Sequence, residues 1–432
     1  MLFAGLSRGT SAARDDSPSS QRAGSSKSAG GRHSRGFRIS DAAIALTVAV
    51  VSRLAIFAVG YKYVAVRHGG HPAAHTLVQR LTSPWDIKDG GLFISIARGG
   101  YTRPHSPAFF PGYPLALRGA ATLTGGNYPV AGVLLSLLCY AGAMLLLYRL
   151  VAAELGTRTA ALTVAFISVF PTALSFSLVY SESLFLLLTL ASFTFARKDR
   201  WLLAGLAGML AVATRSSGLV LLPALLALFA RRRGWTWRRG WWRGLLDVRL
   251  VALLLIPVGL LAYMAYLWQV RGDPLAFSAA EHSYWGRSLA WPTVDPVRSF
   301  HATVTAIHTV TQHRHGWQAA LLPRLGDHDP LLTIFGFGTL VLVIGCIVGG
   351  WRRLAPEYTI YAIGSVLVPL LYPSTVRPLY SFPRLVLVAF PLFMVLGLAT
   401  RKRPVLAWIL IACSFIGMLW LTRVFVLGLP VI

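Results

Sequence analysis

Two carboxylates stand close together in a stretch rich in glycine and aromatic residues. Asp86 and Asp89 belong to the segment WDIKDGGLFISIARGGY at residues 85–101, which is followed by AFFPGYPLALR at residues 108–118. If the segment is helical, residues three apart share a face, so both carboxylates would point the same way. A carboxylate beside glycines that allow close backbone approach can act as a general base toward a hydroxyl group. Helix N-capping is the alternative role for either residue.

The composition indicates the environment of these carboxylates. Hydrophobic residues make up 55% of the 432 residues, and the mean hydropathy is +0.60. Repeated apolar runs near the length that spans a bilayer predict an all-α polytopic membrane protein. The net charge of +26 is concentrated between these runs, which the positive-inside rule explains better than nucleic-acid binding. The three cysteines lie inside apolar runs and indicate packing rather than a disulfide or a metal site.

Apolar runs and polar stretches together predict the domain organisation. We expect a disordered, basic cytoplasmic tail at residues 1–38, followed by a transmembrane domain at residues 39–430 with about eleven helices (roughly 10–13). Long polar loops are expected at residues 67–108 and 271–330. Residues 109–123 are interrupted by prolines and should form a broken or re-entrant helix.

The basic clusters predict the orientation of this domain in the plasma membrane. They lie at residues 197–200, 231–244, 351–353 and 401–403. All four fall on one side of the predicted topology, which the positive-inside rule assigns to the cytoplasm together with the N-terminus. The two long polar loops would then be extracytoplasmic. Most of the acidic residues outside the tail and the basic clusters would lie on that side or near it: Asp86, Asp89, Glu182, Asp273, Glu281, Asp295, Asp327 and Asp329.

Four charged residues within or beside apolar sequence are further candidates. Glu182, in VYSESLF, is an acid next to the membrane and is therefore a functional candidate, with helix capping as the alternative. Arg215, in ATRSSG, and Arg384, in SFPRL, could hold a phosphate through their forked donors, or could snorkel to the interface. Arg53 lies inside the first span, where it either pairs with another helix or snorkels, or faces a lipid-phosphate groove.

Five stretches in the same order resemble the PIG-V-like mannosyltransferases, that is, the GPI mannosyltransferase II group and its bacterial relatives in the GT-C superfamily. They are DGGLFISIARGGY with AFFPGYP, FPTALSFSLVYSESLFLLL, ATRSSGLVLL, GDPLAFSAAEHSYWGR and SFPRLVLVAFPLF. The stretches run from about residue 85 to residue 393. Asp89 matches the acid of the first motif. Two departures are that Lys88 replaces a tryptophan, and that Leu92 and Phe93 replace a Trp-Tyr pair.

The resemblance implies a GT-C fold with extracytoplasmic catalytic loops and a hexosyltransferase activity. A polyprenyl-phosphate donor would supply mannose to an envelope glycolipid, lipoglycan or glycoprotein acceptor by an inverting displacement. The favoured catalytic base is Asp89, with Asp86 as the alternative. The remaining residues expected to bind donor or acceptor are Tyr101, Tyr113, Glu182, Arg215, Trp285, Arg287 and Arg384. Among them, Arg215 or Arg384, together with Arg287, would stabilise the departing lipid phosphate.

The expected partners are the lipid-linked donor, the glycan acceptor and membrane lipids, with no nucleic acid. No cofactor is expected, and the sequence is compatible with a divalent metal but does not indicate one; HRH at residues 313–315 is a weak metal pattern. Two other functions remain open, a lipid-linked-sugar flippase or other transporter and an inactive scaffold of the same fold. The absence of an internal repeat and the acids in outer loops disfavour a transporter. The altered first motif is what suggests a scaffold.

Overall fold

The computed structural model describes residues 34–67, 77–234, 247–312 and 329–429. These residues form helices and contain no β-strand, and an isolated bridge pairs Arg287 with Ser374. The prediction of an all-α protein is confirmed. Residues 1–33 of the predicted tail, and the HRH pattern, lie outside the described residues.

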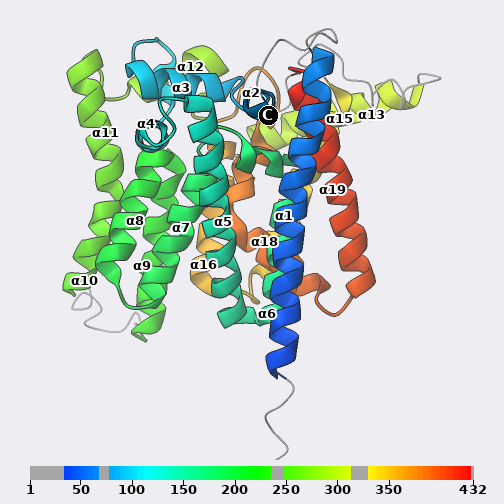
Figure 1. The fold of residues 1–432 in the computed structure, drawn as a ribbon. Coiled ribbons are helices and arrows are strands. Elements are labelled where there is room, and N and C mark those ends of the chain that lie inside the picture. Colours follow the sequence, from blue (N-terminus) through cyan, green and yellow to red (C-terminus); the bar gives the residue numbers. More distant parts are fainter. Residues whose placement is uncertain (1–33, 68–76, 235–246, 313–328, 430–432) are drawn as a thin grey trace, which may run out of the picture.

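The first half of the chain forms a helical bundle with short helices between the long ones (Figure 1). Its elements are α1 (Ser34–Arg67), α2 (Leu77–Thr82), α3 (Asp89–Gly99), η1 (Ser106–Ala108), α4 (Gly112–Thr122), α5 (Tyr128–Leu155), α6 (Thr157–Val169), η2 (Pro171–Ser177), α7 (Glu182–Arg197), α8 (Trp201–Thr214), η3 (Ser216–Val220) and α9 (Leu221–Arg232).

The second half adds helices to the same bundle and a second set of short helices. Its elements are α10 (Val248–Val251), η5 (Ala252–Leu254), α11 (Leu255–Arg271), α12 (Ala276–Trp285), α13 (Val294–Gln312), α15 (Pro330–Gly350), α16 (Pro356–Leu371), α17 (Phe382–Leu385), η6 (Val386–Val388), α18 (Phe390–Thr400) and α19 (Pro404–Val426).

Several of these helices identify an integral membrane protein. Within the described residues, five helices are long and apolar enough to cross a bilayer, in α1, α5, α10–α11, α15 and α19. Two pairs of helices, each sharply bent at a short break, raise the number to seven if each pair is one span. The first bent pair is α6 with η2, and the second is α17–η6 with α18. The helices α8 and α16 are apolar but shorter. The predicted number of about eleven spans is therefore not confirmed, because proline breaks and short helices replace several continuous spans.

The described parts of both predicted polar loops lie at the same end of the bundle. Figure 1 shows α2, α3 and α12 together at the upper end, whereas α1 begins at the opposite end. The predicted broken helix at 109–123 is the short α4, which starts directly after Pro111 at this upper end. A side chain at Gly112 would lie 2.5 Å from Thr214 Oγ1, so glycine lets α4 pack closely against the end of α8.

A buried arginine donates hydrogen bonds to the backbone at the break of the first bent pair. The chain turns by 83° between α6 and η2, where Pro171 interrupts the helix. Arg53 of α1, which is 7% exposed, donates to the carbonyl oxygens of Ser168 at 2.8 Å and Ala173 at 2.7 Å. Its guanidinium also lies 4.6 Å from the ring centroid of Tyr140. Of the two roles considered for Arg53, pairing with another helix is the one observed, because it satisfies carbonyls that the break leaves open.

Candidate active site

A tightly packed turn delivers Asp89 to the upper end of the bundle. Trp85 is fully buried, and a side chain at Gly60 of α1 would lie 2.3 Å from the indole ring of Trp85. The Trp85 carbonyl accepts a hydrogen bond of 3.1 Å from the amide of Val179. The turn is therefore held on one side by α1 and on the other by the segment that leads into α7.

Lys88 has a left-handed backbone, with φ of 56°, immediately before α3 begins at Asp89. Its ammonium donates to the carbonyl of Leu429 and lies 5.3 Å from the ring centroid of Phe425, which ties the turn to the end of α19. Asp89 is thus the first residue inside the helix and not its cap. A carboxylate in the first turn is stabilised by the helix dipole.

Four charged side chains from distant parts of the chain form one cluster. Asp89 Oδ2 lies 2.8 Å from Arg384 Nη1. The Nε atom of Arg384 lies 3.5 Å from Glu182 Oε1, and the same carboxylate oxygen accepts a 2.8 Å hydrogen bond from Arg215 Nη1. We call these residues, Asp89, Glu182, Arg215 and Arg384, the charge cluster.

The charge cluster is buried at its base and open toward Asp89. Glu182 is 1% exposed, whereas the side chains of Arg384 and Asp89 are 13% and 21% exposed. The ring of Tyr180 covers one side of Arg384, with the guanidinium 5.2 Å from the ring centroid. Among the described residues, Glu182 Oε2 is buried without a hydrogen-bond partner. Buried charges of this kind are costly and are typical of functional sites.

Local structure explains how each of these residues reaches the cluster. Glu182 stands in the first turn of α7, and its side chain makes ion pairs instead of capping the helix. Arg215 follows the last residue of α8 in an extended conformation and also donates to Ser181 Oγ at 3.3 Å. Arg384 belongs to α17, a single turn within the second bent pair. Helix ends and breaks therefore supply all four side chains.

The helix α12 and the residues that follow it add a further ion pair that is electrostatically linked to the cluster. Arg287 Nε lies 3.5 Å from Glu281 Oε2, and Arg287 Nη2 donates to the carbonyl of Tyr380 at 3.1 Å. Burial raises the pKa of the Glu281 carboxyl, the charge of Arg287 lowers it, and the negative charge of Asp89 raises it. Burial also lowers the pKa of Arg287. The sequence marked Glu281 only as one of several outer acids.

The other predicted site residues lie outside the charge cluster. Tyr101 is buried and donates to the carbonyl of Phe109 at 2.7 Å. Tyr113 is fully buried, with its hydroxyl 2.9 Å from Ser136 Oγ. The half-buried ring of Trp285 lies 5.6 Å from the Phe109 ring. Asp86 is half-buried in the turn before α3, and the ion pair with Arg384 is made by Asp89.

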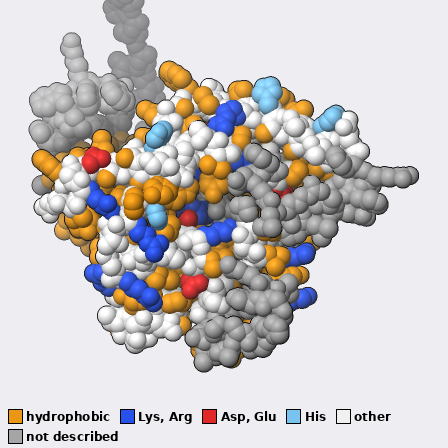
Figure 2. All heavy atoms as spheres, turned by 90° about the horizontal axis from the view of Figure 1, so that it is seen from above, with side chains coloured by type: hydrophobic (Ala, Val, Ile, Leu, Met, Phe, Trp, Pro, Cys, Tyr) orange, Lys and Arg blue, Asp and Glu red, His pale blue; other side chains and the backbone are white. Residues whose placement is uncertain are grey.

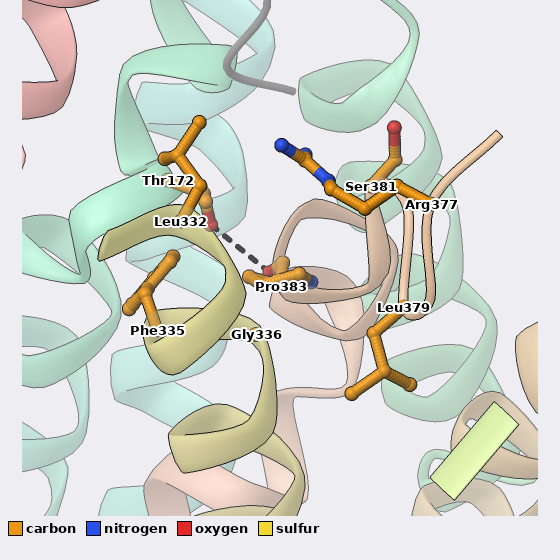
Figure 3. Close-up of a pocket in the computed structure, with 8 residues that line it drawn as sticks. All are labelled: Thr172, Leu332, Phe335, Gly336, Arg377, Leu379, Ser381 and Pro383. Carbon is orange, nitrogen blue, oxygen red and sulfur yellow. Dashed lines mark hydrogen bonds between the residues drawn. The ribbon is translucent and has the colours of Figure 1, made fainter. Parts of the chain in front are cut away.

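Two further features are the upper surface and a small recess lined by residues next to Arg384 in the chain. Figure 2 looks onto the upper end and shows acidic and basic side chains around a hollow near its middle. Figure 3 shows the recess, in which Thr172 Oγ1 donates to the carbonyl of Pro383 at 3.0 Å. It is lined by Thr172, Leu332, Phe335, Gly336, Arg377, Leu379, Ser381 and Pro383. In the described part of the chain, no group of three or more His, Cys, Asp or Glu residues could hold a metal ion.

The fold was compared with solved structures. The chain is 14% identical to the oligosaccharyltransferase of Archaeoglobus fulgidus solved with zinc and sulfate, with a TM-score of 0.41 over 78% of this chain and 47% of the other. A second structure of that archaeal enzyme, with an inhibitory peptide and a dolichol-phosphate, has 14% identity and a TM-score of 0.41, over 91% and 56% of the two chains.

Sequence comparison identifies relatives. The chain is 33% identical over 167 residues to GPI alpha-1,6-mannosyltransferase 2 of Mus musculus, covering 36% of this chain and 33% of the relative. It is 30% identical over 164 residues to GPI mannosyltransferase pigv-1 of Caenorhabditis elegans, covering 32% and 24%. The alignments thus span a third or less of these relatives. Residues 105–261 match the family described as dolichyl-phosphate-mannose-protein mannosyltransferase, and the resemblance to the GPI mannosyltransferases is confirmed.

Proposed function

We propose that this protein is a membrane mannosyltransferase of the GT-C type. Its donor is mannose linked to a polyprenyl phosphate, and its acceptor is a hydroxyl group of an envelope glycolipid, lipoglycan or glycoprotein. The observation that carries the proposal is the contact between Asp89 and Arg384 at the end of an apolar bundle, which pairs a base with a phosphate-binding group. The similarity to GPI mannosyltransferases supports the choice of sugar.

In the proposed reaction, the acceptor oxygen attacks the anomeric carbon of mannose. The bond from that carbon to the phosphate oxygen breaks as the new glycosidic bond forms, which inverts the anomeric centre. Asp89 takes the proton of the acceptor hydroxyl. The polyprenyl phosphate leaves with an additional negative charge, which the guanidinium groups of Arg384 and Arg215 stabilise. Arg287, which pairs with Glu281, is a further candidate for contact with the donor phosphate.

This mechanism requires Arg384 to change partners. In the structure its Nη1 atom lies 2.8 Å from Asp89 Oδ2, which holds the carboxylate away from a hydroxyl proton. A donor phosphate carries the same kind of oxygen ligand and would compete for the guanidinium. Donor binding would therefore release the base, while the buried Glu182 keeps both arginines oriented.

The lipid tail explains why a bundle of apolar helices carries this chemistry. A polyprenyl chain is apolar, so it stays in the bilayer while its phosphate reaches the interface.

The test is a transfer assay in membranes with a radiolabelled polyprenyl-phosphate mannose. Wild type is compared with Asp89→Asn and Asp86→Asn at matched expression, with Asp273→Asn as the control. Asp273 is exposed, and its Oδ1 accepts a local hydrogen bond from the Leu275 amide, which asparagine can keep. We expect Asp89→Asn alone to lose at least about a hundredfold in rate, the scale of a general base.

Other results would change the conclusion in defined ways. Loss with Asp86→Asn alone would keep the enzyme class and move the base to Asp86. Transfer that survives in both variants would contradict general-base catalysis by this loop. If wild type transfers no mannose to any envelope extract, the mannosyltransferase proposal fails, and movement of the lipid-linked sugar across the membrane or a scaffold function becomes the better explanation.

A further inference from the structure

The chain takes an unusual path immediately before Arg384. Leu379 and Ser381 have left-handed backbones, with φ of 53° and 59°, although neither is glycine. A bulky residue such as leucine adopts this conformation only where surrounding contacts impose it. The carbonyl of Ser381 accepts hydrogen bonds from the amides of Arg384 at 3.0 Å and Leu385 at 2.9 Å. The position of α17 and of Arg384 therefore depends directly on this turn.

A buried carboxylate holds the turn from outside. Asp295, in the first turn of α13, is 3% exposed, and its Oδ2 atom accepts a 2.9 Å hydrogen bond from the amide of Leu379. Burial raises the pKa of this carboxyl, while the Leu379 amide and the charge of Arg298 lower it. Among the described residues its other oxygen has no hydrogen-bond partner, and Arg298 lies 3.7 Å from it. The polar contact that justifies burial of this carboxylate is the one to Leu379.

The same turn is attached to the α12–α13 segment at other points. Arg287 donates to the carbonyl of Tyr380 at 3.1 Å, and the Ser374 hydroxyl donates to the carbonyl of Trp285 at 2.6 Å. Arg298 donates to the carbonyl of Ser374 at 3.0 Å. These contacts attach the chain around the turn to α12 and α13. The hydrogen bond that Asp295 accepts is made by Leu379, which is one of the two left-handed residues.

The turn also borders the recess of Figure 3. Leu379 and Ser381 line it, and beyond them Thr172 donates to the carbonyl of Pro383. The turn thus contacts Asp295 of α13, and the residues that follow it contact Thr172 of η2. Loss of one of these contacts leaves the strained residues able to relax and to carry Arg384 with them.

We propose that Asp295 is a positioning residue, which holds the turn at Leu379 and thereby sets Arg384 between Asp89 and Glu182. The measurements of mannose transfer for this inference rest on the proposed function. The measurement of thiol labelling does not, so the inference and the proposed function can fail separately.

The first experiment measures mannose transfer by Asp295→Ala, Asp295→Asn and Arg298→Ala in the full-length protein. We expect Asp295→Ala to lower the rate at least about tenfold, because small misplacements of a catalytic group have effects of this size or larger. Asp295→Asn keeps an oxygen acceptor for the Leu379 amide and should stay within about threefold of wild type. Arg298→Ala removes the bond to the Ser374 carbonyl and the charge beside Asp295, but leaves Asp295 to accept from the Leu379 amide, so it should also stay within about threefold. An equal loss in Asp295→Ala and Arg298→Ala would overturn the proposal.

A second background tests whether Asp295 acts through Arg384. In Arg384→Lys, the added Asp295→Ala change should cost less than about threefold, since residues that act through one another are not additive. The same tenfold loss in both backgrounds would mean that Asp295 acts independently of Arg384 and would contradict the inference. If Asp295→Ala does not fold, Asp295→Ser, which is too short to reach Leu379, replaces it.

The measurement that needs no activity is thiol labelling at position 384. Arg384→Cys is placed in a Cys413→Ser background, because Cys413 is exposed and the other two cysteines, Cys139 and Cys346, are buried. A water-soluble maleimide should label the introduced thiol at least about fivefold faster when Asp295 is alanine, as the turn then opens more often. Equal labelling rates would overturn the positioning role even if the protein proves to be an active transferase. A rate difference in a protein that transfers no mannose would leave the positioning role in place and reject the proposed function.

Discussion

At the scale of single residues, Glu182 is the centre of the charge cluster. One of its oxygens lies 2.8 Å from Arg215 and 3.5 Å from Arg384, so a single carboxylate sets the direction of two guanidinium groups. Asp89 then completes the balance of two negative and two positive charges. The base and the phosphate-binding groups are thus parts of one network, and a change in either will be felt by the other.

Glu182→Gln should therefore impair both stability and transfer. Removing one partner of a buried ion pair costs about 3–5 kcal/mol, and partial exposure of both arginines places the effect near the lower end of that range. Arg384 would then pair more tightly with Asp89, so we expect the transfer rate to fall at least about tenfold. Thermal unfolding in detergent and the membrane transfer assay measure the two effects.

Glu281→Gln is the matched control for this change. The Glu281 side chain is 39% exposed, against 2% for Glu182, and it lies 3.5 Å from Arg287, so its loss should destabilise the protein less than the loss of Glu182. Equal destabilisation by the two glutamine variants would contradict the central place of Glu182.

At the scale of elements, helix breaks decide where charged side chains can go. The apolar stretch at residues 157–177 is divided into α6 and η2, and the stretch at 382–400 is divided before α18. Pro171 and Pro391 lie at these two breaks, as the loss of a backbone donor requires. The first break receives Arg53, and the second presents Arg384 to the charge cluster.

Arg53→Met tests the first of these breaks. The substitution leaves the carbonyls of Ser168 and Ala173 without their guanidinium donor, and each buried unpaired group costs about 1–3 kcal/mol. We expect a clear decrease in the thermal unfolding midpoint. Arg98→Met, at an exposed arginine 4.8 Å from the Tyr128 ring centroid, should change the midpoint little. A stable Arg53→Met protein would show that the break needs no side-chain donor.

At the scale of the whole molecule, the two ends of the bundle carry different elements. The described parts of the long polar loops, with α2, α3 and α12, lie at one end, and the beginning of α1 lies at the other (Figure 1). The charge cluster is formed by α3, α7 and α17 together with the residue that follows α8. A donor whose tail lies in the bilayer could reach this end laterally from the membrane.

Accessibility of single cysteines tests the predicted orientation. In the Cys413→Ser background, Thr102→Cys and Ser288→Cys should react with an impermeant maleimide added to intact cells, because the positive-inside rule places their loops outside. Lys402→Cys should react only after the membrane is permeabilised. All three residues are exposed at their sites. Labelling of Lys402→Cys in intact cells would reverse the orientation.

The sequence by itself determined the helical membrane architecture, the two polar loops and the resemblance to mannosyltransferases. Hydropathy, proline positions and short motifs are local signals, so each can be recognised within a few residues. The sequence also pointed to Asp89, Glu182, Arg215 and Arg384, but one at a time and from separate motifs.

Only the tertiary structure decided which of these residues meet. The pairing of Asp89 with Arg384 joins positions 295 residues apart, and no periodicity in the chain encodes such a distance. The same limitation applies to Arg53, whose partners lie on the α6–η2 break, and to Asp295, whose role depends on the backbone of Leu379. Long-range ion pairs and strained turns arise from the packing of whole helices, so they become visible only when the bundle is assembled.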